Sequence, residues 1–173
     1  MDYSFKEILW KQFGASLDML RNTISMCPEE LFVSNKRFFY MTYHTLVFLD
    51  YYLTLPPDSF SSPLPFTIKD SEEIPDEALD DVIPNKFYSK TELLEYLQHG
   101  HNKCHALISN LTSEKLRERF VEPPGEGAMD YSLLEILLYN MRHVQHHVGQ
   151  LNLLLRQQLN IAPRWIARAK EIS

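Results

Sequence analysis

The sequence predicts an all-α protein: a mostly antiparallel four-helix bundle, with a long crossover between helices 2 and 3 and a short C-terminal helix. Three observations indicate this fold class. Apolar side chains recur every three to four residues over four long segments. Glycine is rare, at five of 173 residues, while apolar residues make up 45% of the chain. A capping-box pattern, whose side chains bind free backbone N–H groups at a helix start, precedes two of the segments.

Prolines bound the first two predicted helices. The first helix is expected over about residues 5–26 and ends before Pro28. The second is expected over about residues 35–55 and is rich in aromatic side chains. It ends before Pro56 and Pro57, because proline disfavours helical geometry in the residue that precedes it.

Capping boxes begin the last two long helices. Ser89 and Glu92 form the pattern for the third helix, and Ser132 and Glu135 form it for the fourth. The fourth helix is expected to run to about Gln158, with apolar residues alternately three and four apart, as in antiparallel bundles.

The segment between the second and third helices is longer than a simple connection needs. It has 33 residues, among them six prolines and eight acidic residues. It can form a lid or rim over a site, or a surface crossover with a short helix near residues 72–79, and the two interpretations are compatible. After the fourth helix, Pro163 precedes the short last helix, expected over residues 165–170.

Composition limits the classes of protein and partner. Residues 1–173 fit a single domain. The net charge of −6 and the scattered lysines and arginines argue against a nucleic-acid partner. Cys27 and Cys104 are too few for a disulfide scaffold and fit a reducing compartment. No signal peptide is apparent, and no uncharged apolar run reaches the length of about 18 residues that a membrane span requires. We therefore expect a cytoplasmic protein that does not bind membranes.

Three histidines are candidates for one metal site. His143 and His147 are four residues apart, so on a helix they project from one face and can chelate a divalent metal as a pair. His44 lies in the aromatic second helix and should be partly buried, where an imidazole needs polar partners. The alternative for His44 is a core histidine bonded to a tyrosine or a carbonyl. His146 is expected in solvent, although it can replace a member of the pair.

A second pair with the same spacing lies in the third helix. His101 and His105 are four residues apart and lie close to His99 and Cys104. Cys104 belongs to the apolar stripe, whereas the pair flanks it on the expected solvent side. We therefore rank a metal site there below the pair in the fourth helix.

Each ligand histidine should have its second ring nitrogen held by a carbonyl, a carboxylate or a hydroxyl. The candidates are Asn140 and Tyr139 for His143, Gln150 for His147, and Tyr40 or Tyr51 for His44. Arg142 is expected to be solvated or paired with an acidic neighbour, and contact with an anionic substrate is the alternative.

The order of these residues resembles the DinB/YfiT-like superfamily of metal-dependent enzymes. That family has one histidine in its second helix, here His44, and a later pair, here His143-x-x-x-His147-x-Gly-Gln150. The likeness extends to the helix lengths, the long crossover and the tail. The resemblance implies that His44, His143 and His147 bind one divalent transition metal, zinc or nickel, with water in the open positions.

The resemblance also implies a function. A metal-dependent transferase or hydrolase would use the ion to activate water or a thiol, and similar proteins favour transfer of a low-molecular-weight thiol. Such an enzyme takes a small-molecule substrate, and a homodimer is expected because similar proteins often pair. The main alternative is a non-catalytic metal-binding or stress-related interaction protein. A third interpretation is a metal-free bundle with incidental histidines.

Overall fold

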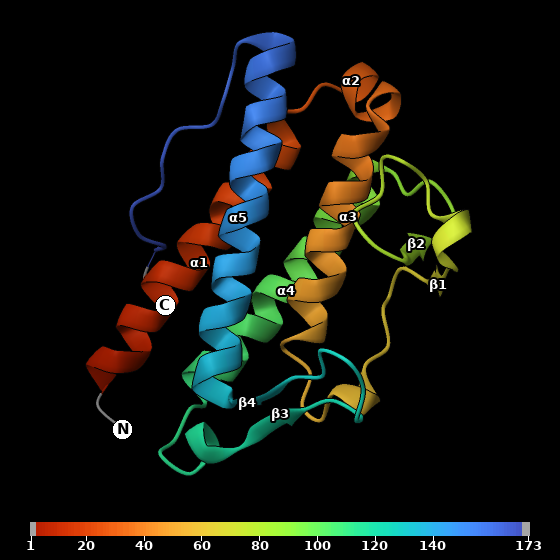
Figure 1. The fold of residues 1–173 in the computed structure, drawn as a ribbon. Coiled ribbons are helices and arrows are strands. Elements are labelled where there is room, and N and C mark those ends of the chain that lie inside the picture. The colour runs from red at the N-terminus through yellow and green to blue at the C-terminus, as the bar shows by residue number, and fades with distance from the viewer. Residues whose placement is uncertain (1–2, 171–173) are drawn as a thin grey trace.

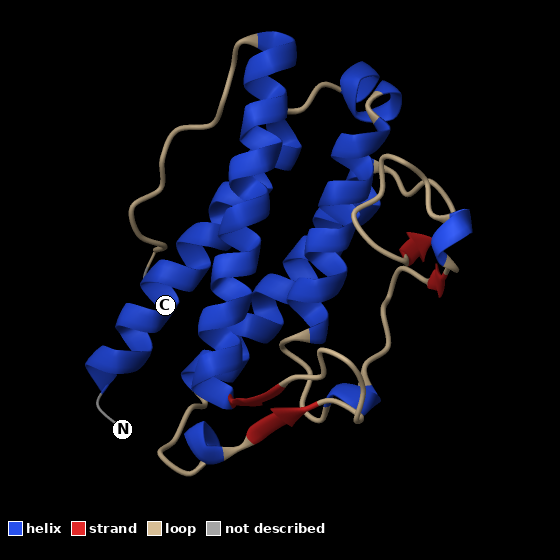
Figure 2. Ribbon diagram, in the orientation of Figure 1, coloured by secondary structure: helices blue, strands red, loops and turns tan. Residues whose placement is uncertain are grey.

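The computed structural model describes residues 3–170 and is mostly helical (Figures 1 and 2). Its α-helices are α1 (Tyr3–Met26), α2 (Glu29–Ser34), α3 (Lys36–Tyr51), α4 (Lys90–Ser109) and α5 (Leu133–Leu159). Two small antiparallel sheets pair β1 (Phe66–Ile68) with β2 (Val82–Pro84), and β3 (Arg119–Val121) with β4 (Asp130–Ser132). The all-α prediction is therefore confirmed in its broad form, while α2 and the two sheets were not predicted.

The four long helices pack against one another around an apolar core. α1 contacts α4 and α5, and α3 also contacts α4 and α5. In Figure 1, α1 and α5 run upward whereas α3 and α4 run downward. The packed pairs α1–α4 and α3–α5 are thus antiparallel, and the pairs α1–α5 and α3–α4 are parallel. The prediction of a mostly antiparallel arrangement is correct for only half of these pairs, because the long crossover returns the chain to the upper end before α4 begins.

Local capping explains where the long helices begin. The Ser89 hydroxyl accepts a hydrogen bond from the Glu92 N–H at 3.2 Å, and the Glu92 carboxylate accepts one from the Ser89 N–H at 2.7 Å. This reciprocal pair confirms the predicted capping box of α4. At the start of α5 the Ser132 hydroxyl accepts from the Glu135 N–H at 3.3 Å. Among residues 3–170, no helix has both the length and the apolar character needed to cross a bilayer.

The tail after α5 contradicts the prediction of a short helix over residues 165–170. It runs along α1 without regular structure. The Ala169 N–H donates to the Lys11 carbonyl at 2.9 Å, and the Trp10 indole N–H donates to the Lys170 carbonyl at 3.1 Å. Six residues are too few to hold a helix without tertiary support, and here the tertiary contacts engage backbone groups that a helix would need.

A glycine in α1 makes room for this tail. A Cβ added at Gly14 would lie 2.7 Å from the Ala169 Cβ and 3.1 Å from the Trp10 ring, so the backbone of α1 and the tail could not approach as closely with a larger residue. Trp165, which precedes this contact, remains 70% exposed beside α5.

The crossover between α3 and α4 is held by its own small sheet and by a buried polar network. β1 pairs with β2, with Thr67 opposite Ile83, and closes residues 69–81 into a loop beside α3. The predicted short helix near residues 72–79 is reduced to one 3₁₀ turn at Ser71–Glu73.

The polar network centres on Asp50 of α3, which is 2% exposed. Its carboxylate pairs with Lys103 of α4 and accepts from the Tyr96 hydroxyl at 3.1 Å. The Tyr96 hydroxyl in turn accepts from Ser62 of the crossover at 3.2 Å. A buried charge needs such partners, and these partners fix the crossover against both helices.

Candidate metal centre

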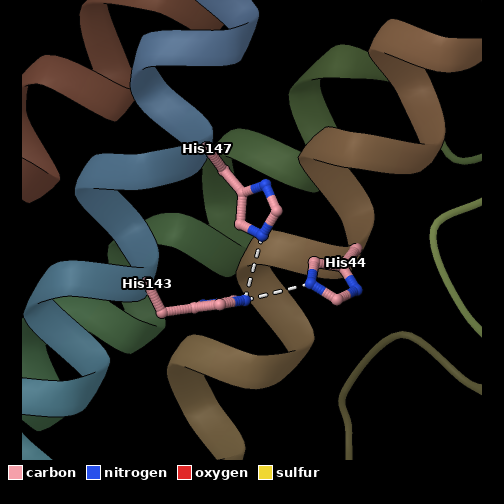
Figure 3. Close-up of side chains that lie close together, drawn as sticks. All are labelled: His44, His143 and His147. Atoms are coloured by element: carbon pink, nitrogen blue, oxygen red, sulfur yellow. Dashed lines mark hydrogen bonds between the residues drawn. The ribbon is translucent and has the colours of Figure 1, made fainter.

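Three imidazoles from two helices meet between α3 and α5 (Figure 3). The Nε2 atom of His143 lies 3.0 Å from Nε2 of His44 and 3.1 Å from Nε2 of His147. One ligand atom of each ring lies within 4.8 Å of the others. The predicted convergence of residues almost one hundred positions apart is therefore confirmed.

The packing of α5 against α3 brings the three rings together. His143 and His147 lie one helical turn apart on α5 and so project to the same side. Asn140, one turn earlier, is buried, and its side-chain amide donates to the Leu49 carbonyl of α3 at 2.9 Å. This bond fixes the register of the two helices and sets His44 opposite the pair. The Oδ1 atom of Asn140 and the Nδ1 atom of His143 each lack a hydrogen-bond partner among the described residues, so the prediction that Asn140 holds the second nitrogen of His143 is wrong.

Two of the three rings have their second nitrogen held by a side chain. The Nδ1–H of His44 donates to the Asp80 carboxylate at 2.7 Å, and the other oxygen of Asp80 accepts from the Val82 N–H at 3.0 Å. The Nδ1–H of His147 donates to the Gln150 side-chain oxygen at 2.7 Å. Both bonds place the proton on Nδ1, so the Nε2 lone pairs of His44 and His147 are directed to their common neighbour.

Gln150 was predicted from the sequence, and Asp80 was not. Asp80 belongs to the acidic crossover. The expectation that this crossover covers a site was the one feature of the sequence that indicated a residue from it near the histidines. Tyr51 was proposed for His44, but its hydroxyl instead donates to Glu122 at 2.7 Å. For His143, Nδ1 is buried and has no hydrogen-bond partner among the described residues.

Burial keeps the α5 rings neutral. Burial first, and then the neighbouring imidazoles of His147 and His44, together lower the pKa of His143 to about 3. The pKa of His147 is lowered to about 4, first by burial and then by His44, against the opposing hydrogen bond to Gln150. Neutral imidazoles are the form that coordinates a metal, so both rings are ready to act as ligands at neutral pH.

The ring nitrogens fit a metal ion. Two nitrogens that each lie about 2.1 Å from a tetrahedral zinc ion are about 3.4 Å apart. The separations of 3.0 and 3.1 Å are within a few tenths of an ångström of this value. A donor set of three imidazole nitrogens suits zinc, nickel and related transition metals. The three histidines can therefore hold such an ion after a small adjustment.

Aromatic side chains form one wall of the centre. The Phe48 ring lies 4.6 Å from the His44 ring and 5.9 Å from the His143 ring, measured between centroids. The Tyr52 ring lies 5.8 Å from the His143 ring. Burial raises the pKa of the Tyr52 hydroxyl, which therefore stays protonated. This wall lowers the local dielectric constant and so strengthens electrostatic interactions at the histidines.

A surface hollow of about 470 Å³ adjoins the centre on α5. It is lined by Tyr139, Arg142, His143, Gln145 and His146. His146 is exposed and outside the group of three nitrogens, as its position on the helix predicted. The hollow gives a small molecule access to at least one ligand histidine.

The second histidine pair forms no comparable group. His101 and His105 instead pack edge-on against Trp10, with ring centroids 5.0 and 4.7 Å from it. Cys104 is fully buried, and desolvation raises the pKa of its thiol, which opposes metal binding. Within residues 3–170, the three nitrogens of His44, His143 and His147 are the one cluster of this kind.

The fold and the site define a mostly helical protein with a three-histidine group able to hold a metal ion. A comparison with family models agrees: the model of the DinB superfamily matches residues 38–151, or 114 of the 173 residues. The match includes His44, His143 and His147. The chain belongs to the DinB superfamily, which confirms the resemblance inferred from the sequence. A search among curated proteins found no match.

Proposed function

We propose that this protein binds one divalent transition metal ion, zinc or nickel, through His44, His143 and His147, and acts as a metal-dependent transferase or hydrolase. The observation that carries the proposal is the convergence of three Nε2 atoms, two of them with their protons held away from the centre. In this proposal the four long helices form the four-helix bundle that positions the ligands.

The residues around the centre have distinct roles in this proposal. Asp80 and Gln150 orient His44 and His147 and make their Nε2 atoms better donors. Phe48 and Tyr52 exclude water from the side of the centre that they cover, and the hollow beside His143 would admit a substrate. The bound ion would supply Lewis acidity, which lowers the pKa of a water or thiol at an open position and so provides a nucleophile at neutral pH.

Among transferase reactions we favour transfer of a low-molecular-weight thiol to an electrophilic small molecule. The preference is based on the likeness of this chain to the superfamily. It is also compatible with the hollow, whose volume of about 470 Å³ is that of a small-molecule site.

A non-catalytic metal-binding role, as in a stress-related interaction protein, is the second candidate. One observation favours it: no carboxylate lines the described hollow beside His143, so an acid or base with an ordinary carboxyl group is missing there. In that role the ion would stabilise the contact between α3 and α5 without turnover.

Elemental analysis of untagged protein tests the metal site. We expect about one transition metal ion per chain in the parent, and a marked loss in His44→Ala, His143→Ala and His147→Ala. His146→Ala, a matched control on the same helix, should retain the metal. Equal metal content in all these variants would refute the site.

Turnover separates the two candidate functions. A metal-loaded transferase should consume a thiol together with an electrophile such as monochlorobimane, and His147→Ala should lose that activity. His99→Ala, at an exposed position of α4 outside the hollow, should keep it. Stoichiometric metal without turnover over a panel of thiols and electrophiles would favour the non-catalytic role.

A further inference from the structure

The hollow beside His143 is built on one face of α5. Tyr139, Arg142, His143 and His146 are spaced at three, four and seven residues from the first, which places them side by side on the helix. One proposed metal ligand therefore shares a hollow with a guanidinium group. A molecule bound there can contact both.

Arg142 is a cation without a partner among the described residues. It is exposed, and among residues 3–170 it has no hydrogen bond or ion pair. The chain carries a net charge of −6, yet the side chains that line the hollow include no carboxylate. The local sign of the charge is thus opposite to that of the whole protein, and it favours an anion.

Arg142 also lies where two hollows meet. With Gln145 it lines a second hollow, between α1, α5 and the tail, to which Trp165 contributes. Arg142 therefore borders open space on more than one side. A ligand that pairs with it can extend away from the metal centre along α5.

We propose that Arg142 determines specificity by binding the carboxylate of a small anionic substrate, while a donor atom elsewhere in the same molecule reaches the metal. This inference rests on the proposed metal site and adds the class of ligand. The planar guanidinium fork matches a carboxylate through two parallel hydrogen bonds. A divalent ion on three neutral imidazoles adds positive charge on the neighbouring side of the hollow, so the site as a whole selects acids over neutral or cationic analogues.

Cobalt-loaded protein provides the test, because its visible d–d absorption reports the metal in the three-histidine site. A sulfur-to-cobalt charge-transfer band then reports a thiol at the metal. The probes are 3-mercaptopropionate and its uncharged isostere 3-mercaptopropanamide. The parent should bind the acid about three- to tenfold more tightly than the amide.

Substitutions of two exposed arginines on α5 test whether Arg142 causes the preference for the acid over the amide. Arg142→Gln should lose most of the preference, with unchanged d–d absorption, and Arg142→Lys should keep more of it. Arg156→Gln makes the same change in net charge further along α5 and should behave as the parent. An undiminished preference in Arg142→Gln, no preference in the parent, or no charge-transfer band with the acid would each overturn the inference and leave the metal site standing. Absence of d–d absorption in the parent would instead refute the proposed metal site, and the inference with it.

Discussion

The three histidines have unequal surroundings, although their Nε2 atoms meet at one place. His44 is held by a carboxylate, His147 by an amide oxygen, and His143 by no side chain among the described residues. A carboxylate makes the opposite nitrogen of an imidazole a stronger donor than an amide does. Asp80 should accordingly contribute more to metal affinity than Gln150.

Asp80→Asn tests this positioning role. The variant should lower metal affinity about 10- to 100-fold without loss of fold, because the Asn side chain removes the charge that orients His44. Competition with a chromogenic chelator measures the affinity, and circular dichroism checks the fold. Asp81→Asn makes the same change at the exposed neighbouring position and should leave affinity unaltered. Similar affinities in the two variants would contradict a role for the carboxylate of Asp80.

The two holding side chains also show what the sequence can and cannot predict about a site. Gln150 is three residues from His147 on the same helix, so helical geometry alone places them together. Asp80 is 36 residues from His44, and its position depends on the pairing of β1 with β2. Strands of three residues are too short to show alternation, so this partner could not be predicted.

At the scale of the elements, the long helices were predictable and the segments between them were not. Apolar periodicity and capping are local properties, and they placed α1, α4 and α5 to within a few residues. The second helix ends at Tyr51, four residues before its predicted end, because the chain turns before reaching the prolines. The tail was predicted wrongly, since its conformation is set by contacts with α1 across the whole sequence.

Two helical glycines offer a matched test of how the tail is held. Gly149→Ala on α5 has no atom within 4 Å of its new Cβ, so it should stabilise the protein by about 0.5–1 kcal/mol through helix propensity. Gly14→Ala gains the same propensity but places its Cβ 2.7 Å from Ala169. Gly14→Ala should therefore not increase the stability of the protein, and it should make the tail more easily cleaved by trypsin at Arg164 and Arg168.

Urea unfolding and limited proteolysis check this pair of substitutions. Equal stabilisation by both, together with unchanged cleavage of the tail, would show that the close approach between α1 and the tail is unimportant.

At the scale of the whole molecule, the stability of the fold depends on the protonation of the site. The reason is that the rings of His143 and His147 are neutral and largely buried where α5 packs against α3. In an unfolded chain a histidine has a pKa of about 6.5. In the folded chain the pKa of His143 is lowered to about 3 and that of His147 to about 4. Below pH 6.5 the unfolded chain therefore binds protons that the folded chain does not, and the folded state is disfavoured.

The metal-free protein should consequently lose stability as the pH falls from about 6.5 to about 3, and show little change from these groups above pH 7.5. We expect a loss on the order of 2–4 kcal/mol between pH 7.5 and pH 5. Urea unfolding in the presence of a chelator, at a series of pH values, measures it. The double variant His143→Gln/His147→Gln should show a flatter profile, and His146→Gln should follow the parent. Identical slopes in the parent and the double variant would exclude these two rings as the origin.

The contact of the tail with α1 has a spectroscopic consequence. Trp10 is 4% exposed, flanked by two imidazoles and bonded to the tail carbonyl of Lys170, whereas Trp165 is 70% exposed. The two indoles of the chain thus occupy opposite environments, one shielded and one open to collisional quenchers. Emission from the shielded Trp10 would report on the core and on its contact with the tail. Emission that a quencher removes would report on Trp165 in solvent. An unlabelled sample therefore contains a separate fluorescent reporter for each of these two regions.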